Sequence, residues 1–336
     1  MINYKIAIFN NTGHSVNLQR QILLANKIKH EVILDRNKFK NQLKLANSIL
    51  IADDVDISIL FTIFYKIKFL YKNRINLNFI FLELYTISYK ALINEVFSYL
   101  LYDNFSFIQF LKQIYFTPSR LIRIILFRLI LKSKSCTIFL PSSLRIKFIS
   151  QILIKEHIYK RVRNLLINNT ASEYNNDLYY QPYSYLFIAG NIYYLNDFKI
   201  ICQFAFKSNI KIVVSSKTKL SNHLTKKFEN TIIQTGPLSH SKIIELTKNC
   251  LAGIAVFTKD NINQNFAASS KLYEYAAYGK PIIVSRVAGV ESEVQEFSIK
   301  NIIYIDQLNT YELDNIPLIN NDFNSSFLYE NDLNLL

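Results

Sequence analysis

The chain has 336 residues, half of them hydrophobic, which is too many for one modest core and favours two domains of ordinary size. Its formal charge is +14, and because the six carboxylates after position 300 stand without any Lys or Arg, residues 1–300 carry +20. An anionic partner is therefore expected. The basic residues are dispersed through apolar segments, and no zinc-finger, helix-turn-helix or RNA-recognition signature occurs, which argues against nucleic acid.

The cysteines, histidines and apolar runs bear on metal sites, disulfides and cellular location. Cys136, Cys202 and Cys250 are odd in number and far apart, which argues against a disulfide framework or a Cys-x-x-Cys metal site. The five His residues lack the spacing of metal ligands. The N-terminus begins directly with a strand pattern, and no run of 18 uncharged apolar residues occurs. We therefore predict a cytoplasmic protein with no metal and no cofactor that does not span a bilayer.

The first half alternates predicted strands with predicted helices. Strands are expected at residues 5–10, 31–34, 48–52, 77–82 and 136–140, and helices at 18–28, from about 57 to 73, at 85–115, at 119–132 and at 144–155. Such alternation predicts a parallel sheet covered on both faces, whose ligands bind beyond the carboxyl ends of the strands. Residues 10–14, 53–54, 83 and 141–143 follow strand ends and are expected to line that edge.

Residues 118–132 are predicted to form a basic amphipathic helix. The segment contains Arg120, Arg123, Arg128 and Lys132 in an otherwise very apolar stretch. Such a helix can lie on an anionic membrane surface. It can equally be a core helix that exposes its Arg side chains to water, and the sequence leaves both interpretations open.

A polar, turn-rich stretch separates the two halves. We predict an N-terminal domain at residues 1–168, a linker at 169–184, a C-terminal domain at 185–310 and an acidic tail at 311–336. Strands are expected at 185–189, 211–215, 231–234, 253–257 and 282–284, with helices at 196–207, 221–228 and 239–250.

The most informative segment is 269–285, SSKLYEYAAYGKPIIVS. Lys271 and Glu274 fall on one face of a predicted helix, which Gly279 can end in a left-handed conformation before Pro281 and an apolar strand. A helix N-terminus with a Lys nearby attracts phosphate, and a carboxylate one turn on can hold ribose hydroxyls. The alternative is a helix and strand packed for stability alone.

This segment resembles the donor-site signature of GT-B glycosyltransferases, in particular family 4, which typically reads P-x-K-L-x-E-Y-x-A-x-G-K-P-V-V-A-S. In matching order, YLFIAGNI, TGPLSHSKIIELTKNC and AGIAVFTKD look like the family's C-terminal segments. HEVILD, ILIADDVDISIL, NLNFIFLELYT and VRNLLINN resemble its N-terminal segments. The resemblance implies an α/β fold of two Rossmann-like domains facing a central cleft, with the acceptor bound by the N-terminal domain and a nucleotide sugar by the C-terminal domain.

The resemblance also implies roles for individual residues. The donor would be bound by Gly190, Asn191, Lys217, Lys219, Ser269, Ser270, Lys271 and Glu274, and the catalytic candidates are Glu83, Asp54 and His14. Basic side chains would replace a metal in neutralising the departing diphosphate. The implied activity is a retaining, hexosyltransferase-type transfer to a glycan or lipid-linked acceptor in bacterial surface polysaccharide biosynthesis, such as lipopolysaccharide or capsule. The implied site of action is the cytoplasm or the inner face of the plasma membrane, in peripheral contact with anionic lipid.

The chain departs from the family pattern at several positions. Ser270 stands where many members have Pro, Phe266 where many have a first Glu, and Leu82 and Asp53 where His is frequent. Lys217 most nearly replaces the usual Arg of the phosphate site, with a point charge instead of a two-pronged donor. Two alternatives therefore stay open: a catalytically inactive GT-B-like protein that binds a partner or a membrane surface, and a nucleotide-sugar epimerase on the same fold.

Overall fold

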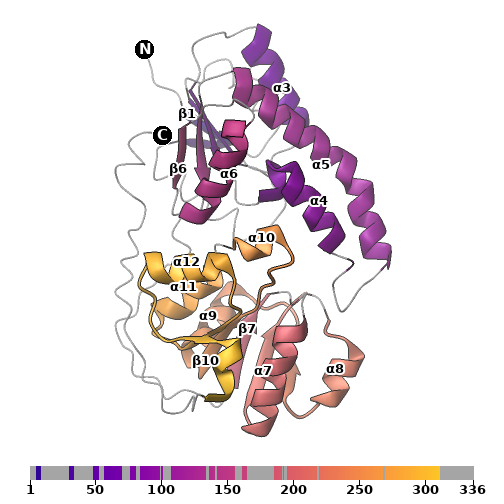
Figure 1. Cartoon of the computed structure of the whole chain (residues 1–336), viewed down its shortest axis with the longest axis vertical. Coiled ribbons are helices and arrows are strands. Elements are labelled where there is room, and N and C mark those ends of the chain that lie inside the picture. The colour runs from indigo at the N-terminus through magenta and orange to yellow at the C-terminus, as the bar shows by residue number, and fades with distance from the viewer. Residues whose placement is uncertain are drawn as a thin grey trace. The chain divides into compact units, whose positions relative to one another are not determined.

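The computed structural model describes sixteen stretches of the chain, which form two compact units with one six-stranded sheet each (Figure 1). The described residues are 5–8, 30–33, 48–52, 57–69, 76–80, 84–98, 100, 107–133, 136–140, 142–155, 161–164, 185–190, 192, 195–217, 219–267 and 269–310. Every strand pairing among them is parallel, as the alternation of strands and helices predicts.

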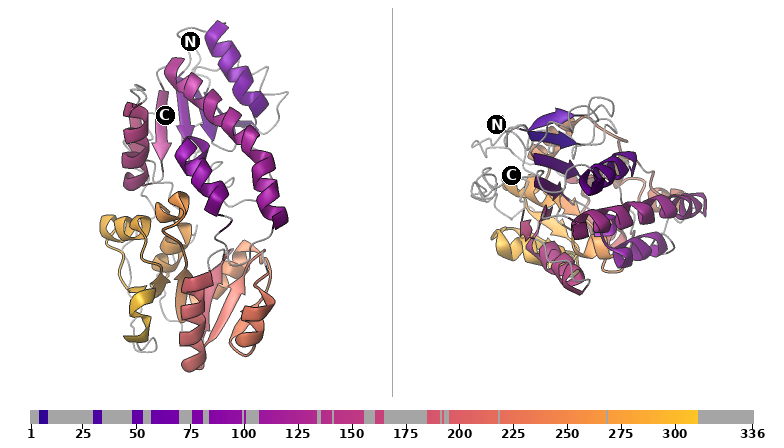
Figure 2. Two further views of the ribbon diagram at one scale, coloured as in Figure 1. Left: turned by 45° about the vertical axis from the view of Figure 1, so that its right-hand side comes forward. Right: turned by 90° about the horizontal axis from the view of Figure 1, so that it is seen from above.

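The first sheet has the strand order β2-β1-β3-β4-β5-β6. Its strands are β1 (Lys5–Ile8), β2 (Glu31–Ile33), β3 (Ser48–Ala52), β4 (Asn76–Ile80), β5 (Cys136–Leu140) and β6 (Arg161–Asn164). The helices of this part are α3 (Ile57–Phe69), η1 (Leu84–Thr86), α4 (Tyr89–Ser98), α5 (Phe107–Ser133) and α6 (Ser143–Lys155). Since β3, β4 and β5 follow one another across the sheet, right-handed crossovers place α3, α4 and α5 on one side of it (Figure 2).

Helix α5 corrects the expectation of two helices separated at Pro118. The helix runs through the proline without interruption for 27 residues. A proline removes one backbone donor and so leaves a carbonyl without its helical partner. Next to it, the Thr117 hydroxyl donates to the carbonyl of Gln113 (2.8 Å) and the Ser119 hydroxyl to that of Phe116 (2.8 Å). These hydroxyls bond back to carbonyls of the preceding turn, a type of contact found where helices bend.

The second sheet has the order β12-β11-β10-β7-β8-β9. Its strands are β7 (Tyr185–Ala189), β8 (Lys211–Ser215), β9 (Ile232–Gln234), β10 (Ala252–Ala255), β11 (Ile282–Val284) and β12 (Ile302–Tyr304). The helices are α7 (Leu195–Lys207), α8 (Asn222–Lys227), α9 (His240–Asn249), α10 (Ile262–Asn265), α11 (Ser270–Ala277), α12 (Ala288–Glu296) and η3 (Ile305–Thr310). Ser221 and Ser239 cap α8 and α9 through their side chains, in agreement with the predicted helix starts.

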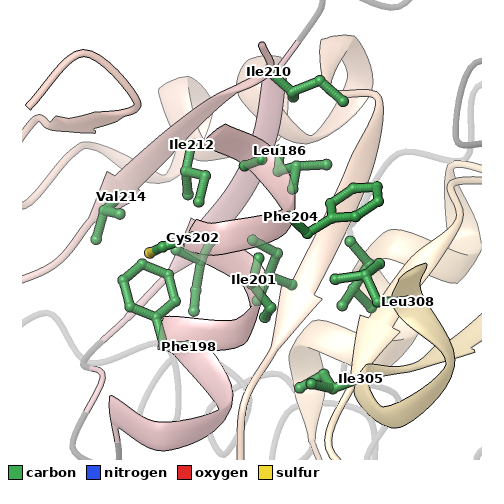
Figure 3. Packing of buried hydrophobic residues seen from close by; sticks show 14 of the residues in the cluster. Leu186, Phe198, Ile201, Cys202, Phe204, Ile210, Ile212, Val214, Ile305 and Leu308 are labelled. Carbon is green, nitrogen blue, oxygen red and sulfur yellow. The ribbon is translucent and has the colours of Figure 1, made fainter. Parts of the chain in front are cut away.

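A large hydrophobic cluster of the second unit lies between one face of this sheet and helix α7 (Figure 3). Leu186 and Ile212 from the strands contact a cluster that includes Phe198 and Ile201 from α7, and Leu308 from η3 closes it. Burying each such side chain stabilises the fold by about 1.5–3 kcal/mol. This packing holds the first turn of α7 near the carboxyl edge of the sheet.

Candidate functional site

The switch point of the second sheet lies between its two central strands. From β7 the chain proceeds outward through β8 and β9, then crosses back to β10 on the other side of β7. In open parallel sheets, ligands bind at the carboxyl edge where the strand order reverses in this way. A ligand site is therefore expected at the residues that follow β7 and β10 and at the helix that leads from β10 to β11.

Helix α11 is fixed to the sheet at this point by Tyr275. Its ring covers Gly253 on β10 so closely that a Cβ atom at position 253 would lie 2.2 Å from a ring carbon. The Tyr275 hydroxyl donates to the backbone carbonyl of Phe187 on β7 (3.1 Å). Burial raises the pKa of the phenol well above its ordinary value, so the hydroxyl keeps its proton. One side chain thus ties the helix to both central strands.

Lys271 lies one turn before Tyr275 and reaches over the end of β7. Side chains four residues apart share a helix face, and the N-terminus of α11 lies at the carboxyl edge of the sheet. The Nζ atom of Lys271 would be 3.0 Å from a Cβ atom at Gly190, the first residue after β7. Gly190 has a φ of 108°, and its N–H donates to the carbonyl of Ser215 (2.7 Å). A side chain at position 190 would therefore meet both backbone strain and the lysine.

The electrostatics around Lys271 suit a bound anion. Burial lowers the pKa of its amine to about 8, and the negative charge of Glu274 partly opposes this shift. Both side chains are half-buried. At the start of the helix, Ser269 occupies the N-cap, but among the described residues its side chain makes no capping hydrogen bond. The positive end of α11 and a partly desolvated ammonium group therefore lie together, with a carboxylate one turn further on.

Two further predicted donor residues follow β8. Lys217 and Lys219 are exposed, beyond the buried Ser215 and Ser216 at the end of that strand. The Ser215 hydroxyl donates to the carbonyl of Gly236 (3.1 Å), which joins the end of β8 to the turn after β9. The two lysines are thus exposed charges close to the carboxyl edge of the sheet.

The structure brings together part of the predicted site. Gly190 and Lys271 are neighbours, Glu274 follows on the same helix, and Ser269 and Ser270 form its start. Gly279 has a φ of 64° and ends the helix region in the predicted left-handed conformation. Asn191 and the catalytic candidates Glu83, Asp54 and His14 lie outside the described residues. Their roles stay predictions.

A cavity of about 470 Å³, which the sequence did not predict, opens at the same edge of the second sheet. It is formed by the loops after β10 and β11, the first turn of α7 and η3; its lining residues are Asn196, Asp197, Ile200, Phe257, Thr258, Lys259, Asp260, Ser285, Arg286, Val287, Ile305 and Asp306. The Ser285 hydroxyl accepts from the N–H of Phe257 (2.9 Å) and so joins two of these loops.

Arg286 is the most constrained charged side chain of the cavity wall. It forms ion pairs with Asp306 (3.1 Å) and Glu291 (3.4 Å), and its guanidinium lies 3.8 Å from the centre of the Tyr304 ring. These contacts hold the β11 loop against η3. The polar residues that directly follow β10 and β11 could have indicated this cavity in the sequence. Its walls, however, come from four segments that only the fold brings together.

The described residues also bear on metals, thiols and membranes. Within the described ranges, no group of three His, Cys, Asp or Glu side chains is placed to hold a metal ion. Cys136, Cys202 and Cys250 are buried and not joined in disulfides, and burial raises the pKa of Cys202 and Cys250 to about 12. Within those same ranges, no helix is both long enough and apolar enough to cross a bilayer.

The fold defines the class of protein. Two units with parallel six-stranded sheets, the second with the strand order of a dinucleotide-binding fold, constitute an α/β protein of GT-B architecture. This confirms the predicted fold class. No protein-family model matches the chain, and no curated protein matches it.

Solved structures supply the comparison. MnaA from S. aureus, determined with UDP, has a TM-score of 0.52 at 11% identity, over 92% of this chain and 86% of its own. A mutant of the T4 phage enzyme BGT in complex with UDP-glucose has a TM-score of 0.50 at 11% identity, over 93% and 90%. The UDP-GlcNAc 2-epimerase from Methanocaldococcus jannaschii has 0.48 at 12% identity, over 94% of each chain. At such identities the similarity establishes the fold alone.

Proposed function

We propose that this protein is a glycosyltransferase that uses a nucleotide-sugar donor. The observation that carries the proposal is the placement of Lys271 over Gly190 at the switch point of the second sheet, with Glu274 one turn along the same helix. A diphosphate at the start of α11 would meet the helix N-terminus and the Lys271 ammonium group. Glu274 would then accept hydrogen bonds from the ribose hydroxyls.

The chemistry asked of these groups is charge neutralisation. When the bond from the sugar to the diphosphate breaks, negative charge develops on the leaving group, and a fixed ammonium group with a helix N-terminus stabilises it. Lys217 and Lys219 are further proposed contacts to the diphosphate, and Gly190 and Asn191 would let the backbone approach it. A metal ion is not required for this role, because the cationic groups of the chain supply the charge.

The finer parts of the proposal concern the acceptor. We propose Glu83, Asp54 and His14 as candidates for activating an acceptor hydroxyl, in a retaining transfer. The acceptor would be a bacterial surface glycan, built on a lipid carrier, of a lipopolysaccharide or capsule. Such an acceptor lies in the membrane, which supports peripheral contact with the inner face of the plasma membrane.

A turnover assay separates the proposal from its alternatives. Purified protein is incubated with UDP-sugars, with and without bacterial lipid-linked glycan acceptors, and the nucleotide and sugar products are measured. Release of nucleoside diphosphate that depends on acceptor, and that Lys271→Ala abolishes, is the expected result. The control is Lys226→Ala, which removes an exposed lysine of α8 and should leave turnover unchanged.

Two outcomes would contradict the transferase proposal. Conversion of the donor into an epimeric UDP-sugar without any acceptor would identify a sugar-nucleotide epimerase. Saturable nucleotide binding with no turnover of any donor would identify an inactive GT-B protein with a binding role.

A further inference from the structure

Helix α5 is apolar on the side that faces away from its own unit. Leu111, Tyr115, Ile122, Ile125 and Leu129 follow one another at spacings of three, four or seven residues, which places them on one face of the helix. These five side chains, the α5 stripe, are between 41% and 77% exposed. On an ordinary surface helix this face carries charged and polar residues.

The opposite side of α5 already supplies the core. Ile124, Phe127, Ile130 and Leu131 are fully buried, and the Phe127 ring packs edge-on against Phe79 of β4, with centroids 5.5 Å apart. The α5 stripe is therefore additional apolar surface and not the core face of the helix. A contiguous exposed surface of this kind marks an interaction site.

The arginines of α5 do not lie where a water-facing helix would place them. Arg128 is buried, where its guanidinium donates to the carbonyl of Ile87 (3.0 Å and 3.3 Å) and lies 4.2 Å from the centre of the Tyr89 ring. Arg120 and Arg123 are only half-exposed. The buried side of α5 agrees with the interpretation of a core helix, but Arg128 does not reach water as that interpretation expects. The exposed apolar side is what favours an additional, surface-binding role.

Neighbouring helices extend the apolar surface. On α3, Phe61 and Tyr65 are four residues apart, and both are more than half exposed. Ile93 on α4 is also more than half exposed. The three helices lie on the same side of the first sheet (Figures 1 and 2). Apolar exposure therefore recurs on this side and is not confined to one helix.

The charge of the chain favours an anionic occupant. Helix α5 contains five Lys and Arg residues and no Asp or Glu. Residues 1–168 hold 25 basic against 9 acidic side chains, a net charge of +16, whereas residues 169–336 hold 14 against 16. A second copy of the chain on this surface would bring two purely basic helices together, which like-charge repulsion opposes. An anionic lipid surface offers acyl chains to the apolar stripe and negative charge to the lysines of α5.

We propose that the α5 stripe docks this protein on an anionic lipid bilayer, with α5 lying in the plane of the headgroups. From Leu111 to Leu129 the stripe is about 27 Å long, which suits a helix that lies along the interface. Lys112 and Lys132, exposed near its two ends, contact the lipid phosphates. The inference deepens the proposed membrane contact by naming the surface that makes it. It does not depend on the proposed reaction, because lipid binding needs no donor.

The first test is sedimentation with vesicles of phosphatidylcholine alone or mixed with phosphatidylglycerol. The full chain should bind the mixed vesicles, and the triple variant Ile122→Ser, Ile125→Ser, Leu129→Ser should lose about tenfold or more in affinity. The matched control is Ile154→Ser, Phe206→Ser, Ile233→Ser, which removes three other exposed apolar side chains. Unchanged binding by the stripe variant, or equal loss in the control, would overturn the proposal.

A second measurement does not rely on a multiple variant. The chain contains no Trp, so Tyr115→Trp introduces a single fluorescent reporter on the stripe and Phe206→Trp one on α7. The emission of the first should shift to the blue with mixed vesicles and that of the second should not. Sedimentation without lipid completes the test: a dimer that the stripe variant converts to monomer would show that this face joins two copies, and would overturn the membrane assignment.

Discussion

At the scale of single residues, the ionisation of Lys271 links the site to pH. Its amine has a pKa of about 8 because burial disfavours the charged form. Above that pH the folded protein releases a proton that the unfolded chain retains up to about its ordinary value of 10.5, so this group makes stability rise with pH between the two values. A bound diphosphate has the opposite preference, because it requires the ammonium form.

Nucleotide affinity is therefore expected to fall in alkaline solution. At about pH 9, UDP should bind about tenfold more weakly than at about pH 7, because about nine tenths of the lysine is then neutral. Isothermal titration of UDP across this range checks the effect. Lys271→Met should bind weakly at every pH with a flat profile, whereas Lys226→Ala should follow the native curve. A native profile that stays level through pH 9 would contradict the assigned role.

Gly253 and Tyr275 give a second prediction at this scale, because they fit as a pair. Gly253→Ala places a methyl group 2.2 Å from the ring and should lower the free energy of unfolding by about 3 kcal/mol. Tyr275→Phe removes only the hydrogen bond to Phe187 and should cost about 1–2 kcal/mol. Urea unfolding measures both. In Gly253→Ala combined with Tyr275→Ala, the clash is gone, so the loss should be smaller than the sum of the losses measured for Gly253→Ala alone and Tyr275→Ala alone. Strict additivity would show that the ring does not press on position 253.

At the scale of secondary-structure elements, Pro118 tests the continuity of α5. The proline removes one backbone hydrogen bond from the middle of a long helix. Pro118→Ala should restore that bond and raise the free energy of unfolding by about 1–2 kcal/mol. Thermal unfolding followed by circular dichroism checks this, with Lys132→Ala, at an exposed position in the last turn, as a near-neutral control. A lower midpoint for Pro118→Ala would mean that the proline fits a bend on which the unit depends.

The same element shows what the sequence could and could not predict. Periodicity and turn residues located most strands and the α7, α8, α9 and α11 helices, because these features depend on neighbouring residues. A break at Pro118 was predicted wrongly, because a proline removes only one helical hydrogen bond and can kink a helix without ending it. Strand β6 was missed because its short RVRN sequence becomes a strand only by pairing with β5.

The candidate site also has a part that the sequence predicts and a part that only the fold shows. Lys271 and Glu274 were found from one contiguous motif. Tyr275 as the anchor of α11, and the cavity near Phe257 and Ser285, depend on contacts between distant segments and were not found. A motif can therefore nominate candidate site residues, while only the fold shows what holds them in place.

At the scale of the whole molecule, charge and chemistry are divided between the two halves of the chain. Residues 1–168 carry a net charge of +16 and the apolar α5 stripe, whereas residues 169–336 are close to neutral and contain the proposed donor site. The first half is thus suited to an anionic surface, whose attraction falls as salt is added. The proposed donor site of the second half would bind its ligand through a few individual groups, such as Lys271 and Glu274, and not through overall charge.

The central claim is that the second unit holds a nucleotide sugar at the start of α11, and a direct binding measurement tests it best. Isothermal titration of UDP and UDP-sugars into the full chain should give saturable binding with one site. Lys271→Ala and Glu274→Ala should each weaken it by about tenfold or more, while Lys226→Ala should bind as the native protein does. Native-like affinity in both site variants, or no binding of any nucleotide by the folded native chain, would contradict the account.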